Sequence, residues 1–449
     1  MSVTTATSKE LLGRPVLKSA ISKAARRLMP MLVILYVVSF LDRTNVGFAE
    51  AALGADKGVS AAAFALGAGI FFIGYAIFEI PSNLLLKKVG AKIWLARIAI
   101  TWGIVSACFA FVQGETSFVI LRFLLGVTEA GLFPGVIMYL AEWFPNKVRV
   151  QMFAIFYLAQ PFSQMIGNPL SGWLINIGDQ VPGLRGWQVM FFVEGLLAVV
   201  AGIAAFFFLI NGPDKAKFLS GEEKYALKEV MALEDNIKDE TGPRGILAAM
   251  RNGRVWYFTA IYFCLQIAVY GVTFFLPQQV SSLTGQKVGL AVGLLIAVPW
   301  FFGIFACYFI GKAANTVIRR RVWGTGLFIS TGLCIFGSAW AGANHIPALG
   351  IIFITLAVCS FLSIGPIAWS YPTAFLTGTA AAAGIGLINS LGNLGGFVAP
   401  ILRTSVNQIT ASETGTMGVY ALGVLPFLAA AMMFATRRFK NKADELLEQ

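Results

Sequence analysis

The feature that most constrains this chain is a series of long apolar runs. Each has about 20 residues with few charges, the length that an α-helix needs to cross the ~30 Å hydrocarbon core of a bilayer. Hydrophobic residues make up 57% of the 449 residues and charged residues only 12%, against about 25% charged in soluble globular proteins. We therefore predict an all-α membrane protein with twelve transmembrane helices, at roughly 31–50, 61–86, 93–112, 117–140, 151–177, 187–210, 255–280, 288–311, 322–341, 347–370, 379–402 and 416–436.

The positive charges predict the orientation of these helices. With both termini in the cytoplasm, most of the 34 Lys and Arg residues fall on that side, and only Lys57, Arg185, Lys287 and Arg403 fall outside. This distribution follows the positive-inside rule, so we predict a multi-pass protein of the cell inner membrane. The net charge of +12 is then a topology signal, and we expect no nucleic-acid partner. The first 30 residues lack the pattern of a removable signal peptide.

A polar segment divides the predicted helices into two sets of six. Charges cluster across residues 211–253, where Ser220 and Glu223 suggest a capping box at the start of an amphipathic cytoplasmic helix. We therefore predict an N-terminal bundle at 1–210 and a C-terminal bundle at 254–449. The halves resemble each other weakly at an offset of roughly 230 residues, which indicates internal duplication. Two pseudo-symmetric six-helix bundles are typical of transporters that rock around a midplane site.

Motifs for intramembrane catalysis are missing from the sequence. The five cysteines stand far apart, and the single histidine, His345, falls in a short external loop. No HExxH, GxSxG or Cys/His cluster occurs, so we predict that the protein is not an enzyme and has neither a metal site nor a cofactor. A receptor or a channel is the remaining alternative to a transporter.

Four ionisable residues lie inside two of the apolar runs: Asp42, Arg43, Arg122 and Glu129. An ionisable side chain at the bilayer centre costs at least ~2.5–3.5 kcal/mol, so such residues usually mark a substrate or ion pathway. Asp42 lies about 16 Å along its run, close to the midplane. Arg122 and Glu129 are two helical turns apart, so we expect both to project from one helix face and to line a polar cavity.

Several stretches, taken together and in order, resemble the major facilitator superfamily and, more narrowly, its anion:cation symporter family. They are LDRTNVGFA (41–49), PSNLLLKKVGAKIWLAR (81–97), RFLLGVTEAGLFPGVIMYLAEWFP (122–145), GWQVMFFVEG (186–195), YGVTFFLPQ (270–278) and NSLGNLGG (389–396). The resemblance implies the major facilitator fold, a monomer, and import of organic anions such as sugar acids, tartrate or aromatic carboxylates with protons. One departure is Lys87, which stands where the loop after the second helix usually has an aspartate, so the usual cytoplasmic latch cannot form in its common way.

The proton carrier is expected in the first half of the chain. Residues 241–412 contain no Asp or Glu. Three acids of the first half are better explained in other ways. Glu79 and Glu142 lie near the cytoplasmic ends of their helices, where gate or loop ion pairs are expected, and Glu194 is expected to be structural. Asp42 and Glu129 remain as the predicted proton-coupling residues.

The arginines predict how an anion and a proton are coupled. Arg122 is the predicted main carboxylate anchor and Arg43 a second one, because the planar guanidinium donates two parallel hydrogen bonds. A substrate anion then competes with Asp42 or Glu129 for the positive charge, and the displaced acid binds a proton. Static salt bridges between the first and fourth helices are the alternative. The resemblance adds four neutral substrate-binding residues, Tyr75, Gln160, Trp369 and Asn389, with Gln164, Gln266, Tyr270 and Asn393 as second choices.

Taken together, the sequence predicts a proton-coupled secondary transporter that imports a small organic anion by alternating access. Its expected partners are that anion, protons and the lipid bilayer. The alternative within transport is an exchanger or facilitator of the same fold without net proton coupling.

Overall fold

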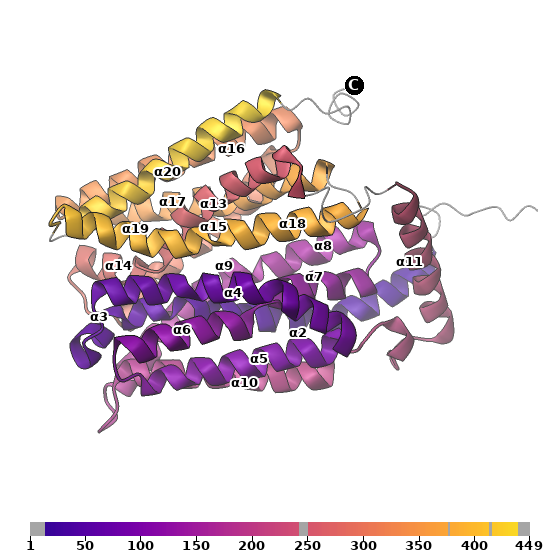
Figure 1. The fold of residues 1–449 in the computed structure, drawn as a ribbon, viewed down its shortest axis with the longest axis horizontal. Coiled ribbons are helices and arrows are strands. Elements are labelled where there is room, and N and C mark those ends of the chain that lie inside the picture. The colour runs from indigo at the N-terminus through magenta and orange to yellow at the C-terminus, as the bar shows by residue number, and fades with distance from the viewer. Residues whose placement is uncertain (1–13, 242–249, 376–377, 413–414, 439–449) are drawn as a thin grey trace, which may run out of the picture.

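The computed structural model describes residues 14–241, 250–375, 378–412 and 415–438, and every regular element in these ranges is a helix (Figure 1). The first half contains α2 (Pro15–Thr44), α3 (Val46–Lys57), α4 (Ala61–Val89), α5 (Ala91–Cys108), α6 (Glu115–Glu129), α7 (Leu132–Trp143), α8 (Asn146–Tyr157), α9 (Ala159–Gly178) and α10 (Gly186–Phe208). Then follow α11 (Gly221–Thr241), α13 (Gly253–Thr273), α14 (Leu276–Thr284), α15 (Leu290–Ala313), α16 (Val317–Ala343), α17 (Pro347–Phe375), α18 (Gly378–Asn393), α19 (Gly395–Ile409) and α20 (Thr416–Ala435).

The predicted membrane spans coincide with these helices. Each apolar run falls on one helix or on two consecutive helices, and 11 helical segments of the described chain are long and apolar enough to cross a membrane. The remaining run, 151–177, forms α8 and α9, in which the polar side chains of Gln160, Gln164 and Asn168 lower the hydropathy. α2 begins at Pro15, well before the predicted start of its span. The all-α membrane architecture is therefore confirmed.

Five spans are interrupted near their middle. The breaks fall at Asn45, at Ala130 and Gly131, at Leu158, at Phe274 and Phe275, and at Leu394. Gly131 has a φ of +90°, which a residue with a side chain rarely adopts. Irregular backbone at membrane depth is tolerated where it is buried in protein or lines a cavity. The breaks therefore indicate where a cavity lies.

The helices form two groups. Figure 1 shows α2 to α10 packed together on one side and α13 to α20 on the other, with α11 across one end. At the opposite end, where α3 and α14 lie, main-chain atoms of one group are in direct contact with main-chain atoms of the other. A Cβ atom on Gly172 would lie 2.3 Å from the carbonyl oxygen of Gly289, and one on Gly293 would lie 2.3 Å from that of Asn168. These four residues, called the glycine seam below, leave no room for a side chain, so this end is closed.

The charged helix α11 is fixed to the first half of the chain. Its predicted capping box is confirmed, because the Glu223 amide donates to Ser220 Oγ at 3.2 Å and the Ser220 amide donates to Glu223 Oε2 at 2.9 Å. Glu223 Oε1 also accepts hydrogen bonds from Lys23 Nζ at 2.8 Å and Ser19 Oγ at 2.7 Å, both on α2. These bonds, that of Lys23 foremost, lower the pKa of Glu223 to about 2. On the apolar face of α11, Leu227 is fully buried.

Candidate functional site

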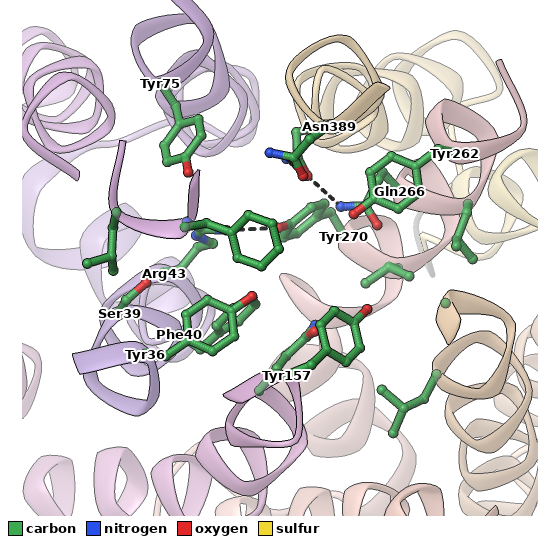
Figure 2. Close-up of a pocket in the computed structure, with 18 of the residues that line it drawn as sticks. Tyr36, Ser39, Phe40, Arg43, Tyr75, Tyr157, Tyr262, Gln266, Tyr270 and Asn389 are labelled. Carbon is green, nitrogen blue, oxygen red and sulfur yellow. Dashed lines mark hydrogen bonds between the residues drawn. The ribbon is translucent and has the colours of Figure 1, made fainter. Parts of the chain in front are cut away.

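A cavity lies between the two groups of helices, at the level of the helix breaks. Its volume is about 50 Å³, room for a few water molecules that each need at least ~10–15 Å³. Figure 2 shows its side chains converging from both halves of the chain. The polar lining residues are Tyr36, Ser39, Arg43, Tyr75, Glu129, Tyr157, Gln160, Tyr262, Gln266, Tyr270, Asn389 and Asn393.

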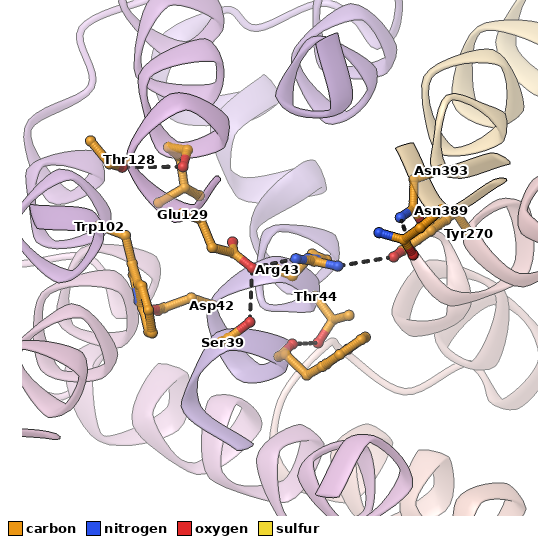
Figure 3. A network of polar contacts seen from close by, with 12 residues as sticks. Ser39, Asp42, Arg43, Thr44, Trp102, Thr128, Glu129, Tyr270, Asn389 and Asn393 are labelled. Carbon is orange, nitrogen blue, oxygen red and sulfur yellow. Dashed lines mark hydrogen bonds and ion pairs between the residues drawn. The ribbon is translucent and has the colours of Figure 1, made fainter. Parts of the chain in front are cut away.

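Among the described residues, Arg43 is the cation that lines this cavity and Glu129 the carboxylate. Arg43 Nη2 forms an ion pair with Glu129 Oε1, which also accepts a hydrogen bond of 2.8 Å from Ser39 Oγ. Arg43 Nη1 donates to the hydroxyl of Tyr270 at 3.1 Å. Figure 3 shows Arg43 between Glu129, from the first group of helices, and Tyr270, from the second. A single buried cation therefore joins the two halves of the chain.

Two polar atoms of this pair have no hydrogen-bond partner within the part of the chain that the structure describes: Arg43 Nε and Glu129 Oε2. Both residues are buried, with exposed fractions of 8% and 0%. A buried polar atom without a partner costs ~1–3 kcal/mol, so both atoms gain from a polar ligand that enters the cavity. The guanidinium carbon also lies 4.9 Å from the ring centre of Phe40 and 5.1 Å from that of Phe71. This combination of a free donor and aromatic walls suits a small anion with an apolar or hydroxylated body.

Asp42 does not line the cavity, although it precedes Arg43 in the sequence. Adjacent residues of a helix point about 100° apart, and Asp42 points towards α5. Its carboxylate accepts hydrogen bonds from Trp102 Nε1 at 2.9 Å and from Ser106 Oγ at 2.8 Å. Neutral donors, and no arginine of the described residues, therefore hold the Asp42 carboxylate, and its competition with a substrate for an arginine stays a prediction. Its part in proton coupling stays a prediction.

Arg122 is also placed outside the cavity. Its Nε and Nη2 donate to the main-chain oxygens of Gly67 and Ala68 at 3.0 and 3.3 Å, and the residue is 1% exposed. The expectation that Arg122 and Glu129 line one cavity is wrong here, because Arg43 of α2 is the arginine beside Glu129. The role of Arg122 as a carboxylate anchor stays a prediction.

Three amides form a chain along the cavity wall of the second half. Gln266 Nε2 donates to Asn393 Oδ1 at 2.7 Å, and Asn393 Nδ2 donates to Asn389 Oδ1 at 3.2 Å. Gln266 and Asn393 were second choices from the sequence, and the structure places both beside Asn389 in the cavity lining. These three amides offer donors and acceptors that can form hydrogen bonds with hydroxyl groups on a substrate.

The amide chain continues into a contact between the two halves. Glu79 of α4 is 2% exposed and accepts hydrogen bonds from Asn389 Nδ2, at 3.3 Å, and from Ser390 Oγ. The sequence suggested an ion pair at Glu79; this is wrong for the described residues, where its partners are an amide and a hydroxyl. We call Glu79, Asn389 and Ser390 the inter-half clasp.

The remaining predicted binding residues divide into two sets. Tyr75 and Gln160 line the cavity, whereas Trp369 and the second-choice Gln164 do not. The ring of Trp369 packs edge-on against that of Tyr262, with 5.0 Å between ring centres, and Tyr262 is itself part of the lining. Trp369 therefore supports the cavity wall from behind, and direct substrate contact by its indole stays a prediction.

Sequence reasoning missed three tyrosines of the lining: Tyr36, Tyr157 and Tyr262. A usable signal was present on α13. Tyr262, Gln266 and Tyr270 follow one another at intervals of four within an otherwise apolar helix, which places their side chains on one face. Tyr36, Ser39 and Arg43 on α2 follow at intervals of three and four, which also share a helix face, so both faces were predictable as polar.

Comparison with known proteins places this chain in a family. The family model of the Major Facilitator Superfamily matches residues 32–400. The chain belongs to the Major Facilitator Superfamily. This major facilitator is 39% identical over 422 residues to the inner membrane transport protein RhmT of Escherichia coli (strain K12), covering 94% of this chain and 96% of that protein. It is 42% identical over 418 residues to a putative tartrate transporter of Agrobacterium vitis, covering 93% and 94%.

A solved structure of the superfamily shows the same fold. The crystal structure of a D-xylose-proton symporter superposes with a TM-score of 0.72 at 15% identity, over 91% of this chain and 97% of that chain. The predicted major facilitator fold is thus confirmed, and so is the prediction of a transporter, not an enzyme. The names of the relatives are consistent with the anion:cation symporter family.

Proposed function

We propose that this major facilitator imports a small organic anion together with protons. The candidate substrates are sugar acids, tartrate-like diacids and aromatic carboxylates, and the name of the Agrobacterium vitis relative supports an organic acid. The observation that carries the proposal is that Arg43, the cavity cation, is shared between Glu129 and Tyr270.

The shared guanidinium accounts for anion recognition. A carboxylate that enters the cavity accepts hydrogen bonds from Arg43, whose Nε has no other partner among the described residues. The planar fork suits a carboxylate better than a lysine ammonium does. Tyr75, Gln160 and Asn389 then read the neutral part of the substrate.

The same contact accounts for proton coupling. When a substrate anion forms an ion pair with Arg43, Glu129 loses its counter-ion while it stays buried. A buried carboxylate without a counter-ion favours its protonated form, so binding of the anion and binding of a proton to Glu129 promote each other. Asp42 is proposed as a second proton-coupling residue. Arg122 is proposed as a further carboxylate anchor in a conformation whose cavity extends to its guanidinium.

Transport requires the cavity to change shape. The cavity volume of about 50 Å³ is far below the ~300–1,000 Å³ of typical small-ligand pockets, so the cavity has to widen to admit a substrate. We propose that residues 1–210 and 254–449 form two bundles, joined by 211–253, that rock about the cavity. Opening one end breaks the glycine seam, and opening the other breaks the inter-half clasp.

The proposed setting is the inner membrane of a bacterium. Both termini and α11 lie in the cytoplasm in this orientation, as the positive-inside rule predicts. The transporter works as a monomer, because its cavity is completed by two halves of one chain.

Reconstitution into proteoliposomes tests the proposal. We expect uptake of a radiolabelled organic anion to follow an inward proton gradient and to collapse with a protonophore. Glu129→Gln mimics the protonated acid, so it should retain counterflow and lose accumulation driven by pH. Glu222→Gln, at an exposed position of α11 outside the cavity, is the matched control and should retain both.

Two other results would contradict the proposal. Wild-type uptake that ignores pH gradients indicates the alternative, an exchanger or facilitator without net proton coupling. Unfolding of Glu129→Gln indicates a static salt bridge, because Arg43 is then left unpaired in the membrane. The substrate itself can be found by a thermal-shift screen of organic acids, since a ligand at 100 times its Kd stabilises the fold by ~2.7 kcal/mol.

A further inference from the structure

Two grooves on the outer surface of the first half meet at Arg27. The first, which we call the basic groove, has a volume of about 830 Å³ and lies where α2, α5 and α10 reach the end that carries α11. Its charged lining residues are Arg27, Lys92, Lys215 and Lys217. No described Asp or Glu lines it, so the groove concentrates positive charge.

The cations of the basic groove are positioned without being neutralised. Lys92 Nζ lies 4.9 Å from the ring centre of Phe206, and the guanidinium carbon of Arg27 lies 5.3 Å from that of Phe208. None of the four cations forms an ion pair with a carboxylate of the described chain. Cation–π contacts hold the side chains of Arg27 and Lys92 at the groove and leave their charge available to an anion.

The second groove, the apolar groove, continues from Arg27 along α2 and α10. It has a volume of about 500 Å³, and most of its lining is aliphatic, including Ile34, Val38 and Val200. From Arg27 to Val38 the helix rises about 16 Å at ~1.5 Å per residue, roughly half of a ~30 Å hydrocarbon core. This is the depth that one acyl chain occupies in a single leaflet.

We propose that the two grooves bind an anionic glycerophospholipid, with its phosphate among the cations of the basic groove and one acyl chain in the apolar groove. Basic pockets between transmembrane helices recognise anionic lipid headgroups. A free phosphate ion would use the basic groove alone and leave the apolar groove unexplained. Phe207, which is 71% exposed beside the basic groove, faces the membrane that supplies the lipid.

The lipid joins parts of the chain that are separate in sequence. Arg27 belongs to α2 and Lys92 to α5, while Lys215 and Lys217 belong to the segment that leads from α10 into α11. A bound phosphate therefore stabilises the attachment of the linker to the first half. The site is distinct from the substrate cavity and does not depend on which anion is transported.

Native mass spectrometry of the full detergent-solubilised chain tests the site. Phosphatidylglycerol and phosphatidylethanolamine with identical acyl chains are offered in equal amounts, and we expect phosphatidylglycerol to be retained at least about fivefold more. Combined Arg27→Gln, Lys92→Gln and Lys217→Gln substitutions should abolish this preference. The matched control is Lys88→Gln, Lys312→Gln and Arg319→Gln, which removes the same charge at exposed positions outside both grooves and should keep the preference.

Two further experiments distinguish a bound lipid from a free anion and provide a substitute if the triple variant misfolds. Val200→Trp fills the apolar groove from an exposed position and should weaken phosphatidylglycerol binding without any change of charge. Full lipid binding by Val200→Trp, together with displacement of lipid by inorganic phosphate, would reduce the site to an anion site and overturn the proposal. If the triple variant does not fold, Lys215→Glu with Lys217→Glu, in the exposed loop, takes its place. Equal retention by wild type and these variants would also overturn the proposal.

Discussion

Arg43 and Tyr270 form a hydrogen bond of 3.1 Å between α2 and α13, which belong to opposite halves of the chain. The same guanidinium is ion-paired within its own half to Glu129. Arg43 therefore takes part in a contact inside one half and in a contact between the halves, and the proposed binding of a substrate at its guanidinium would change both.

Removing the hydroxyl of Tyr270 tests the contact between the halves. In Tyr270→Phe the Nη1 of Arg43 loses its partner in a buried site, and we expect a loss of ~1–3 kcal/mol of stability. Thermal unfolding in detergent measures this loss. Tyr308→Phe is the control, because Tyr308 is exposed on α15, and its melting temperature should not change. Equal melting temperatures for wild type and Tyr270→Phe would show that the contact contributes nothing.

Lysine substitutions rank the two arginines as carboxylate anchors. Arg43→Lys keeps the positive charge but removes the planar guanidinium, which can donate hydrogen bonds to Glu129, Tyr270 and a substrate at the same time. The affinity for the anion should therefore fall at least about tenfold, ~1.4 kcal/mol. Arg122→Lys should cost less affinity, because Arg122 bonds to main-chain oxygens outside the cavity. Dissociation constants from thermal-shift titration give the ranking. A greater loss in Arg122→Lys would restore Arg122 as the main anchor.

The inter-half clasp predicts how the end near α11 opens. Glu79→Ala removes the acceptors of Asn389 Nδ2 and Ser390 Oγ, so we expect the halves to separate more often at this end. Distances between spin labels at the exposed Lys87 and Arg319, in opposite halves, should lengthen. Glu79→Gln keeps one acceptor oxygen and should give an intermediate distribution. Identical distributions in all three proteins would exclude the clasp from gating.

Trp369→Ala should alter which organic anions compete for uptake more than it alters proton dependence. The indole packs against Tyr262, so its loss changes the shape of the cavity wall and leaves the charges in place. Competition profiles with a panel of acids in proteoliposomes measure the effect. An unchanged profile would assign Trp369 to packing alone.

The attachment of α11 should depend on pH through Glu223. Its pKa is about 2 in the folded protein, below the ordinary value of 4.5, because of Lys23 foremost and the Ser220 amide next. A lowered folded pKa stabilises above the unfolded value, so this contribution is complete above about pH 4.5 and is lost as the pH falls towards 2. Hydrogen exchange of α11 should therefore accelerate, beyond its intrinsic pH trend, between pH 5 and 3.

Substitution identifies the group responsible for this pH dependence. Glu223→Gln should remove it, whereas Glu222→Gln, at the exposed neighbouring position, should preserve it. A pH response that survives in Glu223→Gln would assign the titration to another group.

The spans and half of the site were predictable because they follow from local sequence. Hydropathy depends only on the residues of a run, and helical spacing places Ser39 and Arg43 on one face. The hydrogen-bond and ion-pair partners of the buried polar side chains were not predictable in this way. Asp42 and Arg43 are adjacent, yet α5 supplies the partners of one, and α6 and α13 those of the other. Spacing along a helix defines a face, and only the packing of other helices decides what that face meets.

The case of Arg122 shows the same limit. Both Arg122 and Glu129 lie on α6, two helical turns apart as expected, but a guanidinium can be satisfied by main-chain oxygens as well as by a carboxylate. Glu79 was assigned an ion pair for a similar reason, since an amide and a hydroxyl from a distant helix carry no charge signal in the sequence.

The glycine seam makes this end of the transporter sensitive to a single methyl group. At Gly172 and Gly293 the atoms that an added Cβ would meet are peptide oxygens, which cannot rotate aside as a side chain does. A methyl group at either position is therefore a wedge that no rotamer change relieves. The two halves can come together here only as long as both positions remain glycine.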